Sequence, residues 1–438
     1  MTDTATGLRR TTTSNATGLH RFLDMPRGDY RLEATATGYT SLVVSNITLV
    51  VKTPSSVNIR FQIAGVATSV TVESLAPLIN RTDASLGNTL QQDQLSEWPI
   101  ADRNVVQLLS LQPGVAYLGN QLNAATDTRS GAVNGARSDQ SNVTLDGIGV
   151  NDQNNGYAFT SVLNVPPDSV QEFRVTTANA NADSGYSSGA QVALVTKGGT
   201  NSFHGSACEY NRNTIFSAND PFLKASQLAN GQSNTAPKLL RNVFGATAGG
   251  PIKKNRLFFF ANYEGRRDAQ GSSVLRTVPS DTLRAGDLVY KCADPTQCPG
   301  GTVNGVTRVQ SGYYALGPTQ IQQIDPLGIG VNQAVLNVLQ KYPTANESAG
   351  DGSNTLGYRF SSNADSKFNT YITRLDYRLT ASGSQTLFLR GQTQNVKQPG
   401  TQEFPGQSAA ITTVLDDSKG LTIGLTSVIS PRLTNEFH

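Results

Sequence analysis

A serine between glycines is the feature of this sequence that could most directly do chemistry. Ser187 lies in residues 185–189, which match the G-x-S-x-G pattern that places the nucleophile of many hydrolases on a sharp strand-to-helix turn. Such a serine needs a base, and the histidines of the chain are His20, His204 and His438. The residues after the motif alternate like a strand and not like a helix. We therefore expect a turn at Ser187 and no enzyme, with a serine hydrolase as the alternative.

The usual sequence patterns of metal-binding and nucleotide-binding sites are absent. Residues 152–156 are similar to the start of a calcium-binding loop, but Leu163 stands where such a loop carries its bidentate glutamate. Neither H-E-x-x-H nor paired C-x-x-C spacing for zinc occurs, and no G-x-x-x-x-G-K-[ST] loop is present to hold phosphates. We predict no metal and no cofactor.

The cysteines bear on the redox compartment. Cys292 and Cys298 lie close together in a stretch with proline and glycine, whereas Cys208 is remote in sequence. A disulfide between Cys292 and Cys298 would fit an oxidising compartment, and we expect this pairing. Two unpaired surface thiols are the alternative.

The composition favours strands and turns over long charged helices. Only 15% of the 438 residues are charged, and 41 are glycine. The net charge of +3 and the scattered Lys and Arg residues give no footprint for nucleic acid, so we expect no such partner. No stretch approaches the roughly 18 apolar residues of a membrane helix, and the N-terminus lacks a signal-peptide pattern. Either the chain is cytoplasmic or its start is missing.

The pattern of apolar residues divides the chain into three expected domains. Residues 1–73 alternate at period two in short strands, as in residues 30–34, which predicts a small antiparallel β-sandwich. Residues 74–200 mix strands with a short amphipathic helix that Asp102 is expected to cap, which predicts an α/β domain. Residues 201–438 contain several strands with alternating apolar and polar positions.

These last strands fit a membrane-spanning sheet, in which apolar residues facing lipid alternate with polar residues facing inward over about 9–11 positions. In residues 371–379 the polar Arg374, Asp376 and Arg378 share one face. In residues 256–266 the alternation is interrupted by Phe258 and Phe260. One such strand alone would better fit a soluble sheet, but several together favour a membrane. The further candidates are residues 203–211, 243–250, 387–394 and 421–429.

Several motifs resemble a known family. Residues 18–39 resemble the carboxypeptidase regulatory-like domain. Residues 145–147, 170–173 and 185–205 look like the plug of TonB-dependent outer-membrane receptors and its junction with the first barrel strand. Residues 249–265 strengthen that match. The resemblance is strongest to the Oar-like receptors, which carry the same sandwich, and no single motif carries it.

The resemblance implies a receptor in the cell outer membrane that binds an extracellular ligand and passes it through a plugged β-barrel, using energy coupled by TonB. In the family an extended segment pairs with TonB by β-strand addition. We expect this contact at Val70, Thr71 and Val72, with the last strand or linker of the sandwich as the alternative. Ligand contacts are expected at the plug apex, where a solvated turn is the alternative. The apex candidates are Asn151, Asn154, Asn155 and Tyr157.

The expected fold is therefore mainly β: a small β-sandwich, an α/β plug and a partial antiparallel transmembrane β-barrel that is truncated. Plugged transporters close with about 22 strands, and residues 201–438 hold about six to eight. We expect an incomplete piece that also lacks the first sandwich strands, with residues 267–368 as a long extracellular loop. A secreted or surface β-rich adhesin or glycan-binding protein without transport is the alternative function. Import, export and signalling remain open at this point.

Overall fold

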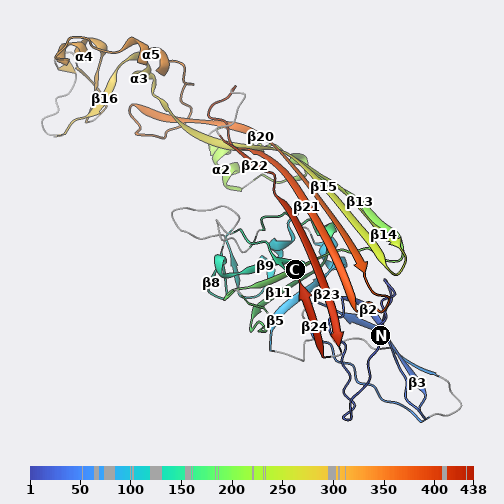
Figure 1. Ribbon diagram of the computed structural model, residues 1–438. Coiled ribbons are helices and arrows are strands. Elements are labelled where there is room, and N and C mark those ends of the chain that lie inside the picture. The colour runs from blue at the N-terminus through green and yellow to red at the C-terminus, as the bar shows by residue number, and fades with distance from the viewer. Residues whose placement is uncertain are drawn as a thin grey trace.

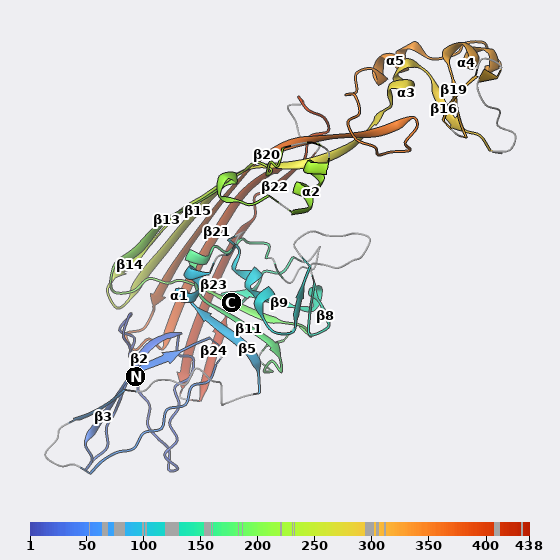
Figure 2. The same cartoon turned by 180° about the vertical axis from the view of Figure 1, so that it is seen from behind.

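The computed structural model shows a long sheet with a central unit against one of its faces, an N-terminal sheet at one end and an outer lobe at the other (Figures 1 and 2). It describes residues 1–51, 53–63, 69–73, 84–98, 100, 103–118, 131–152, 159, 161–182, 184, 185, 187–219, 221–229, 231, 233–293, 302, 303, 306–310, 312–406, 412–430 and 432–438.

The N-terminal sheet has four strands in the order β1-β2-β3-β4. They are β1 (Thr2–Asp3), β2 (Gly28–Ala34), β3 (Ser41–Leu49) and β4 (Ser69–Glu73). Tyr30 and Leu32 of β2 are buried and their neighbours are not, as the period-two pattern predicts. They pack with Leu42, Val44 and Ile47 of β3. Strand β4 pairs in parallel with β3 and is an edge of this sheet.

The central unit is built on a five-stranded sheet in the order β10-β9-β12-β11-β5. These strands are β5 (Leu86–Gln91), β9 (Asn142–Leu145), β10 (Ile148–Gly149), β11 (Val170–Ala178) and β12 (Gln191–Thr196). A smaller sheet holds β6 (Val115–Tyr117), β7 (Gly131–Val133) and β8 (Ala136–Arg137). The helices are α1 (Gln92–Glu97) and the 3₁₀ segments η1 (Val105–Leu111), η2 (Ser138–Gln140) and η3 (Pro167–Ser169). One face of the five-stranded sheet carries the core, which includes Phe173, Leu145 and Leu194.

The helix expected after Asp102 exists but differs in type and cap. It is the 3₁₀ helix η1, and the side chain of Asn104 accepts a hydrogen bond from the amide of Val106 at 3.2 Å. Asp102 itself lies outside the described residues. Asparagine caps as well as aspartate does, so the sequence could not decide between the two neighbours.

The long sheet has eight antiparallel strands, and all six predicted membrane segments coincide with parts of them to within one residue at either end. The strands are β13 (His204–Asn213), β14 (Leu239–Lys253), β15 (Leu257–Pro279), β20 (Thr355–Arg378), β21 (Gln385–Pro399), β22 (Thr413–Asp416), β23 (Lys419–Ser430) and β24 (Leu433–Phe437). Between β13 and β14 lie η4 (Thr214–Phe216) and α2 (Pro221–Ala229). Among the described helices, none has the length and apolar character to cross a membrane.

Phe258 and Phe260 do not interrupt the alternation of β15. They are 2% and 1% exposed and lie on the same face as the buried Asn262 and Glu264. This inner face is covered by other parts of the chain at this level, so it accepts apolar as well as polar residues. The expectation that inward positions must be polar was therefore wrong for this strand.

Residues 267–368 are not a simple loop, which corrects the sequence expectation. Strands β15 and β20 stay paired from Leu257 opposite Tyr377 to Pro279 opposite Thr355. At about 3.3 Å per residue, each strand is roughly twice as long as a membrane crossing needs. The continued pairing of β15 with β20 could not be predicted from the sequence, because a ladder of backbone hydrogen bonds needs no apolar face and residues 268–273 are mostly polar.

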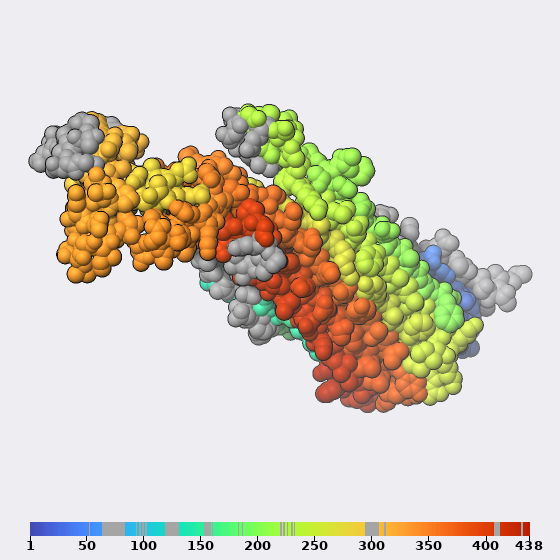
Figure 3. All heavy atoms as spheres, turned by 90° about the horizontal axis from the view of Figure 1, so that it is seen from above, coloured from blue at the N-terminus to red at the C-terminus, as the bar shows by residue number. Residues whose placement is uncertain are grey.

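The far end of this paired ladder carries the outer lobe, which projects beyond the long sheet (Figure 3, orange). The lobe contains α3 (Asp281–Ala285), β16 (Leu288–Lys291), β17 (Thr302–Val303), β18 (Val306–Gln310), β19 (Tyr313–Leu316), α4 (Pro318–Ile324) and α5 (Gln333–Leu339). The rings of Tyr342 and Phe404 meet edge-on, with their centres 5.4 Å apart. Phe404 lies between β21 and β22, so this connection of the long sheet contacts the lobe.

Candidate functional site

The structure places the expected apex residues only in part. Asn151 is described, and both ends of its side chain are used: Oδ1 accepts from the amide of Val143 at 2.9 Å, and Nδ2 donates to the carbonyl of Ser141 at 3.0 Å. These bonds hold the end of β9 in place. The other apex candidates, Asn154, Asn155 and Tyr157, lie outside the described residues.

The expected TonB contact, Val70 to Val72, lies in the edge strand β4 of the N-terminal sheet. That is the position of the alternative, the last strand of the sandwich. Among the strands that the structure describes, β4 pairs only with β3, and an edge strand can accept another strand on its other side. Both interpretations therefore remain compatible with the fold.

The structure describes Cys292 of the expected disulfide and the serine of the G-x-S-x-G pattern. Cys292 is disulfide-bonded, but Cys298 lies outside the described residues, so their pairing stays a prediction. The hydroxyl of Ser187 donates to the carbonyl of Gln140 at 2.6 Å, and strand β12 follows the motif. Ser187 thus has the surroundings of a turn residue. Within the described part of the chain, no group of acidic, cysteine or histidine side chains is arranged to hold a metal ion.

The central unit is joined to the long sheet by buried charges, and Asp146 is the centre of one cluster of them. Its carboxylate accepts from the amide and hydroxyl of Thr196 at 2.9 and 2.8 Å. From the long sheet, Arg374 of β20 donates to Asp146 at 3.0 Å, and the guanidinium Nε of Arg390 of β21 lies 2.9 Å from Asp146 Oδ2. The side chains of Asp146 and Arg390 are 2% and 1% exposed. Asp146 therefore pairs with cations from two strands of the long sheet.

The cluster continues along the inner face of the long sheet. Arg374 also pairs with Asp376 at 2.9 Å, as expected for residues that share one face of the strand. The ring of Phe388 lies 4.8 Å from the Arg374 guanidinium. Arg390 donates to Gln392 and Thr422 at 3.1 and 2.7 Å. These partners fix the arginines in the positions that Asp146 needs.

A second ionic contact is made by Arg103 of the central unit. Its guanidinium donates to Glu264 of β15 at 2.8 and 3.1 Å and to Asp168 at 2.5 Å. It also lies 4.7 Å from the centre of the Tyr210 ring of β13. Burial alone would lower the pKa of Arg103, but the two carboxylates outweigh it and raise the pKa above its ordinary value. Arg103 stays charged and bridges the two parts.

A third contact uses neutral groups around Asn164. Its backbone amide donates to the side-chain oxygen of Gln394 at 2.7 Å, and its carbonyl accepts from Gln392 at 2.6 Å. Gln394 also donates to the carbonyl of Val162 at 2.9 Å. Amide side chains of β21 thus bind the backbone of the central unit as a neighbouring strand would.

The link from the central unit to the long sheet passes very close to the backbone of the sheet at Gly199. A Cβ at this position would lie 2.4 Å from the carbonyl oxygen of Phe259 and 2.7 Å from that of Gly250. No side-chain movement can relieve contacts with backbone atoms. The close approach therefore requires glycine.

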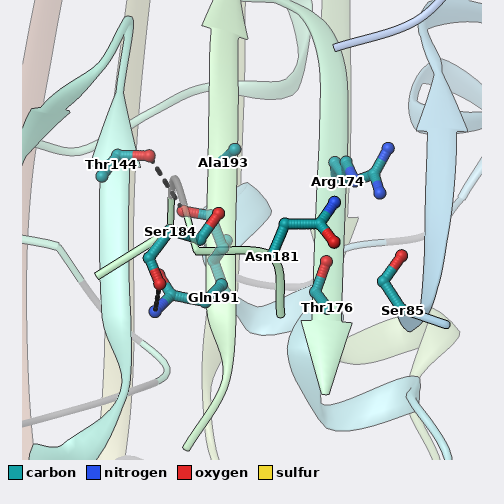
Figure 4. A pocket seen from close by; sticks show the side chains of 9 residues that line it. Ser85, Thr144, Arg174, Thr176, Asn181, Ser184, Gln191 and Ala193 are labelled. Carbon is teal, nitrogen blue, oxygen red and sulfur yellow. Dashed lines mark hydrogen bonds between the residues drawn. The ribbon is translucent and has the colours of Figure 1, made fainter. Parts of the chain in front are cut away.

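The five-stranded sheet of the central unit has its hydrophobic core on one face and a shallow polar hollow on the other (Figure 4). Thr144, Arg174, Thr176 and Gln191 line it, and Gln191 donates to the carbonyl of Ser184 at 3.4 Å. Arg174 points from β11 and donates to the carbonyl of Val51 at 2.8 Å. The hollow is small and its groups bond to the chain itself, so we assign no ligand to it.

Glu172, beside Arg174 on β11, should make the stability of the fold depend on pH. Burial raises the pKa of Glu172, and the opposing effects of Arg27 and the Val51 amide are smaller. The folded protein then binds this proton more tightly than the unfolded chain does. The free energy of unfolding should therefore rise as the pH falls through the raised pKa towards the unfolded value of about 4.3. Denaturant unfolding at several pH values should show a smaller rise for Glu172→Gln; identical profiles would contradict the assignment.

Sequence reasoning singled out residues 145–147 only as part of a resemblance and did not identify Asp146, Arg103 or Asn164 as interface residues. A local sequence signal was available for one of them, because Asp146 precedes Gly147 and this pair is common in tight turns. In the structure both Asp146 and Arg103 adopt left-handed backbone angles, with φ of 50° and 56°. Their partners on the long sheet are more than a hundred residues away in sequence.

Comparisons with known proteins agree with this architecture. The model of the family described as "Outer membrane beta barrel domain" matches residues 195–438, more than half of the chain, and that of the carboxypeptidase regulatory-like domain matches residues 1–62. A curated relative, the TonB-dependent transporter Oar of Myxococcus xanthus, is 26% identical over 265 residues, which cover 58% of this chain and 23% of that protein. The chain thus spans about a quarter of the length of this relative.

Solved structures of outer-membrane receptors are also similar. The outer membrane transporter YddB from Escherichia coli has a TM-score of 0.46 and 9% identity, over 78% of this chain and 37% of that one. The siderophore receptor PirA from Acinetobacter baumannii has a TM-score of 0.35 and 16% identity, over 79% of this chain and 45% of that one. The family matches and the relative carry the assignment. The chain belongs to the outer membrane beta barrel domain family, matches the carboxypeptidase regulatory-like domain over residues 1–62, and is similar in sequence to the TonB-dependent transporter Oar.

Proposed function

We propose that the central unit is the plug of a ligand transporter, and that the long sheet is part of the barrel wall around it. The observation that carries this proposal is the set of buried contacts that Asp146, Arg103 and Asn164 make with the inner face of the long sheet. A unit bound in this way occupies the space that a closed barrel would enclose. Passage of an extracellular ligand would then require the unit to move, with energy coupled by TonB.

The lengths of the connections support one orientation in the membrane. The turns between β14 and β15 and between β20 and β21 are short, and they lie at the end next to the N-terminal sheet. The connection between β15 and β20 is long and carries the outer lobe at the opposite end. Barrels of the outer membrane have short periplasmic turns and longer extracellular loops. The N-terminal sheet is accordingly periplasmic, and the outer lobe is extracellular.

Buried ion pairs suit a plug that must stay in place and yet be released. Such pairs fix the register of two surfaces, while the desolvation of the charges keeps their net contribution to stability small. The two ionic contacts, at Asp146 and Arg103, and the neutral contact at Asn164 therefore position the plug without making its displacement prohibitive. The apex candidates Asn151, Asn154, Asn155 and Tyr157 would lie on this plug, and we propose them for ligand contact together with the outer connections of the long sheet.

A pair of proline variants can test the TonB contact. Successive amides of a strand point to opposite sides, so one of Val70 and Thr71 points to β3 and the other to the open side of β4. Proline at the open position would remove one hydrogen bond to an added TonB strand and leave the pairing with β3 intact. We expect that variant, either Val70→Pro or Thr71→Pro, to bind the purified periplasmic domain of TonB about tenfold more weakly.

The matched control is the same change at Thr11, an exposed residue outside the strands of this sheet. Binding of TonB would be measured by titration with the protein in detergent. Equal affinity of wild type and both strand variants would contradict a TonB contact at β4, and would leave the contact to a segment outside the described residues.

A further inference from the structure

We infer that the N-terminal domain is a latch that ties the plug to the wall of the barrel, so that it must be released before the plug can move. This inference rests on the proposed function, in which the central unit is the plug and the long sheet is part of the barrel wall. The N-terminal domain is bonded at the same time to the turns of the long sheet and to strand β11 of the central unit.

The attachment to the wall is made by a turn, residues 3–8, that presents its carbonyl groups outward. Asp3 Oδ1 accepts from the amides of Ala5 and Thr6 at 2.8 and 3.1 Å, and Gly7 closes the turn with a φ of 72°. The amides of Ala5, Thr6 and Gly7 are thereby satisfied within the turn. The carbonyls of Ala5 and Thr6 remain as acceptors for donors from elsewhere.

Donors on the long sheet and on the link that leads into β13 use these carbonyls. The backbone amide of Asn201 donates to Ala5 at 3.1 Å, and its side chain donates to Thr6 at 2.9 Å. Arg378, at the end of β20, donates to the same Thr6 carbonyl at 3.0 Å. In the opposite direction, Arg10 donates to the carbonyl of Gly383 in the turn between β20 and β21 at 3.1 Å, a bond that is buried.

The attachment to the plug is made at Val51, just after β3. Its amide donates to Glu172 Oε1 at 2.8 Å, and its carbonyl accepts from Arg174 at 2.8 Å. Glu172 and Arg174 lie two residues apart on β11 and face the same side. Arg27 of the N-terminal domain adds an ion pair, with its Nη1 3.4 Å from Glu172 Oε2. A carboxylate and a guanidinium on neighbouring positions thus hold both backbone groups of one residue.

Because β2 and β3 join the two attachments through one packed sheet, the attachments should be thermodynamically coupled. Two amides report on them separately. The amide of Asn201 is protected by its bond to the turn, and the amide of Val51 by its bond to the plug. Loosening one attachment should expose the other amide, although no contact of that amide has been changed.

The test is hydrogen–deuterium exchange, resolved to single amides, on the protein purified in detergent. Arg378→Met removes the donor to Thr6 at the wall and keeps the apolar stem. It should speed exchange of the Val51 amide about fivefold. Arg174→Met removes the donor to Val51 at the plug and should speed exchange of the Asn201 amide by a similar factor, since coupling is reciprocal.

Arg359→Met is the matched control, because Arg359 lies on the same strand as Arg378 but pairs with Glu347 near the outer lobe. It should change neither amide. Unchanged protection within the β2–β3 ladder shows that the domain remains folded in each variant. If each variant speeds exchange only at its own attachment, the two contacts are independent and the latch is overturned. The measurement needs neither TonB nor ligand, so its failure leaves the proposed transport standing, and failed TonB binding leaves the latch standing.

Discussion

Replacing Asp146 with alanine should lower the free energy of unfolding of the central unit by about 3–5 kcal/mol. The change leaves Arg374 and Arg390 buried on the inner face of the long sheet without the carboxylate that pairs with both. It also removes the acceptor for Thr196, where the central unit ends. The cost of an uncompensated buried charge is larger than the net gain from the original pair, so the loss should be severe.

The single tryptophan of the chain makes this effect measurable. Trp98 follows α1 in the central unit, so its fluorescence reports on that unit during denaturant unfolding in detergent. Asp146→Asn separates charge from backbone, because asparagine accepts the left-handed φ of 50° at this position. Asp139→Ala, at an exposed ion pair with Arg137, is the control and should change stability by less than about 0.5 kcal/mol. Equal stability of Asp146→Ala and wild type would contradict the role of the cluster.

Replacing Gly199 with valine should prevent the central unit from docking against the long sheet. The added Cβ alone would lie 2.4 Å from one backbone oxygen and 2.7 Å from another, and the branched side chain adds further overlap. Strands β14 and β15 would have to separate from the link, because neither oxygen belongs to a movable side chain. We expect a loss of more than about 4 kcal/mol, which is exceptional for a single substitution.

The matched control is Gly149→Val in β10, where an added Cβ meets no atom within 4 Å. Both variants would be followed by the Trp98 unfolding transition and by the fraction of protein recovered folded from membranes. A folded Gly199→Val protein with wild-type stability would show that the link does not pass against the sheet as described.

The strands of the long sheet could be predicted because the alternation of apolar and polar residues is visible within each segment of the sequence. Period-two alternation located all six segments, and the shared face of Arg374 and Asp376 was visible in the sequence. The full length of β15 and β20 was not visible, because outside a membrane a paired strand can be polar on both faces. The outer lobe was expected as part of a loop, because its helices have only 5 to 7 residues and give little helical periodicity.

The candidate site could be predicted only in outline. The motif around Asp146 drew attention through family resemblance, yet its function as an ion-pair partner depends on Arg374, which is 228 residues away. Arg103 follows Asp102, which was expected to cap a helix, and nothing local indicates a bond to Glu264. Contacts between domains depend on how whole elements pack, and a single sequence contains no record of that packing.

Electrical conductance across a planar lipid bilayer tests whether the central unit closes the passage through the barrel. The protein as its host makes it would be inserted, and single-channel currents of wild type would be compared with those of Asp146→Ala. Wild type should be silent at rest, and the variant, with its plug loosened from Arg374 and Arg390, should open to a large aqueous conductance. If wild type conducts as freely as the variant, the central unit does not close the passage.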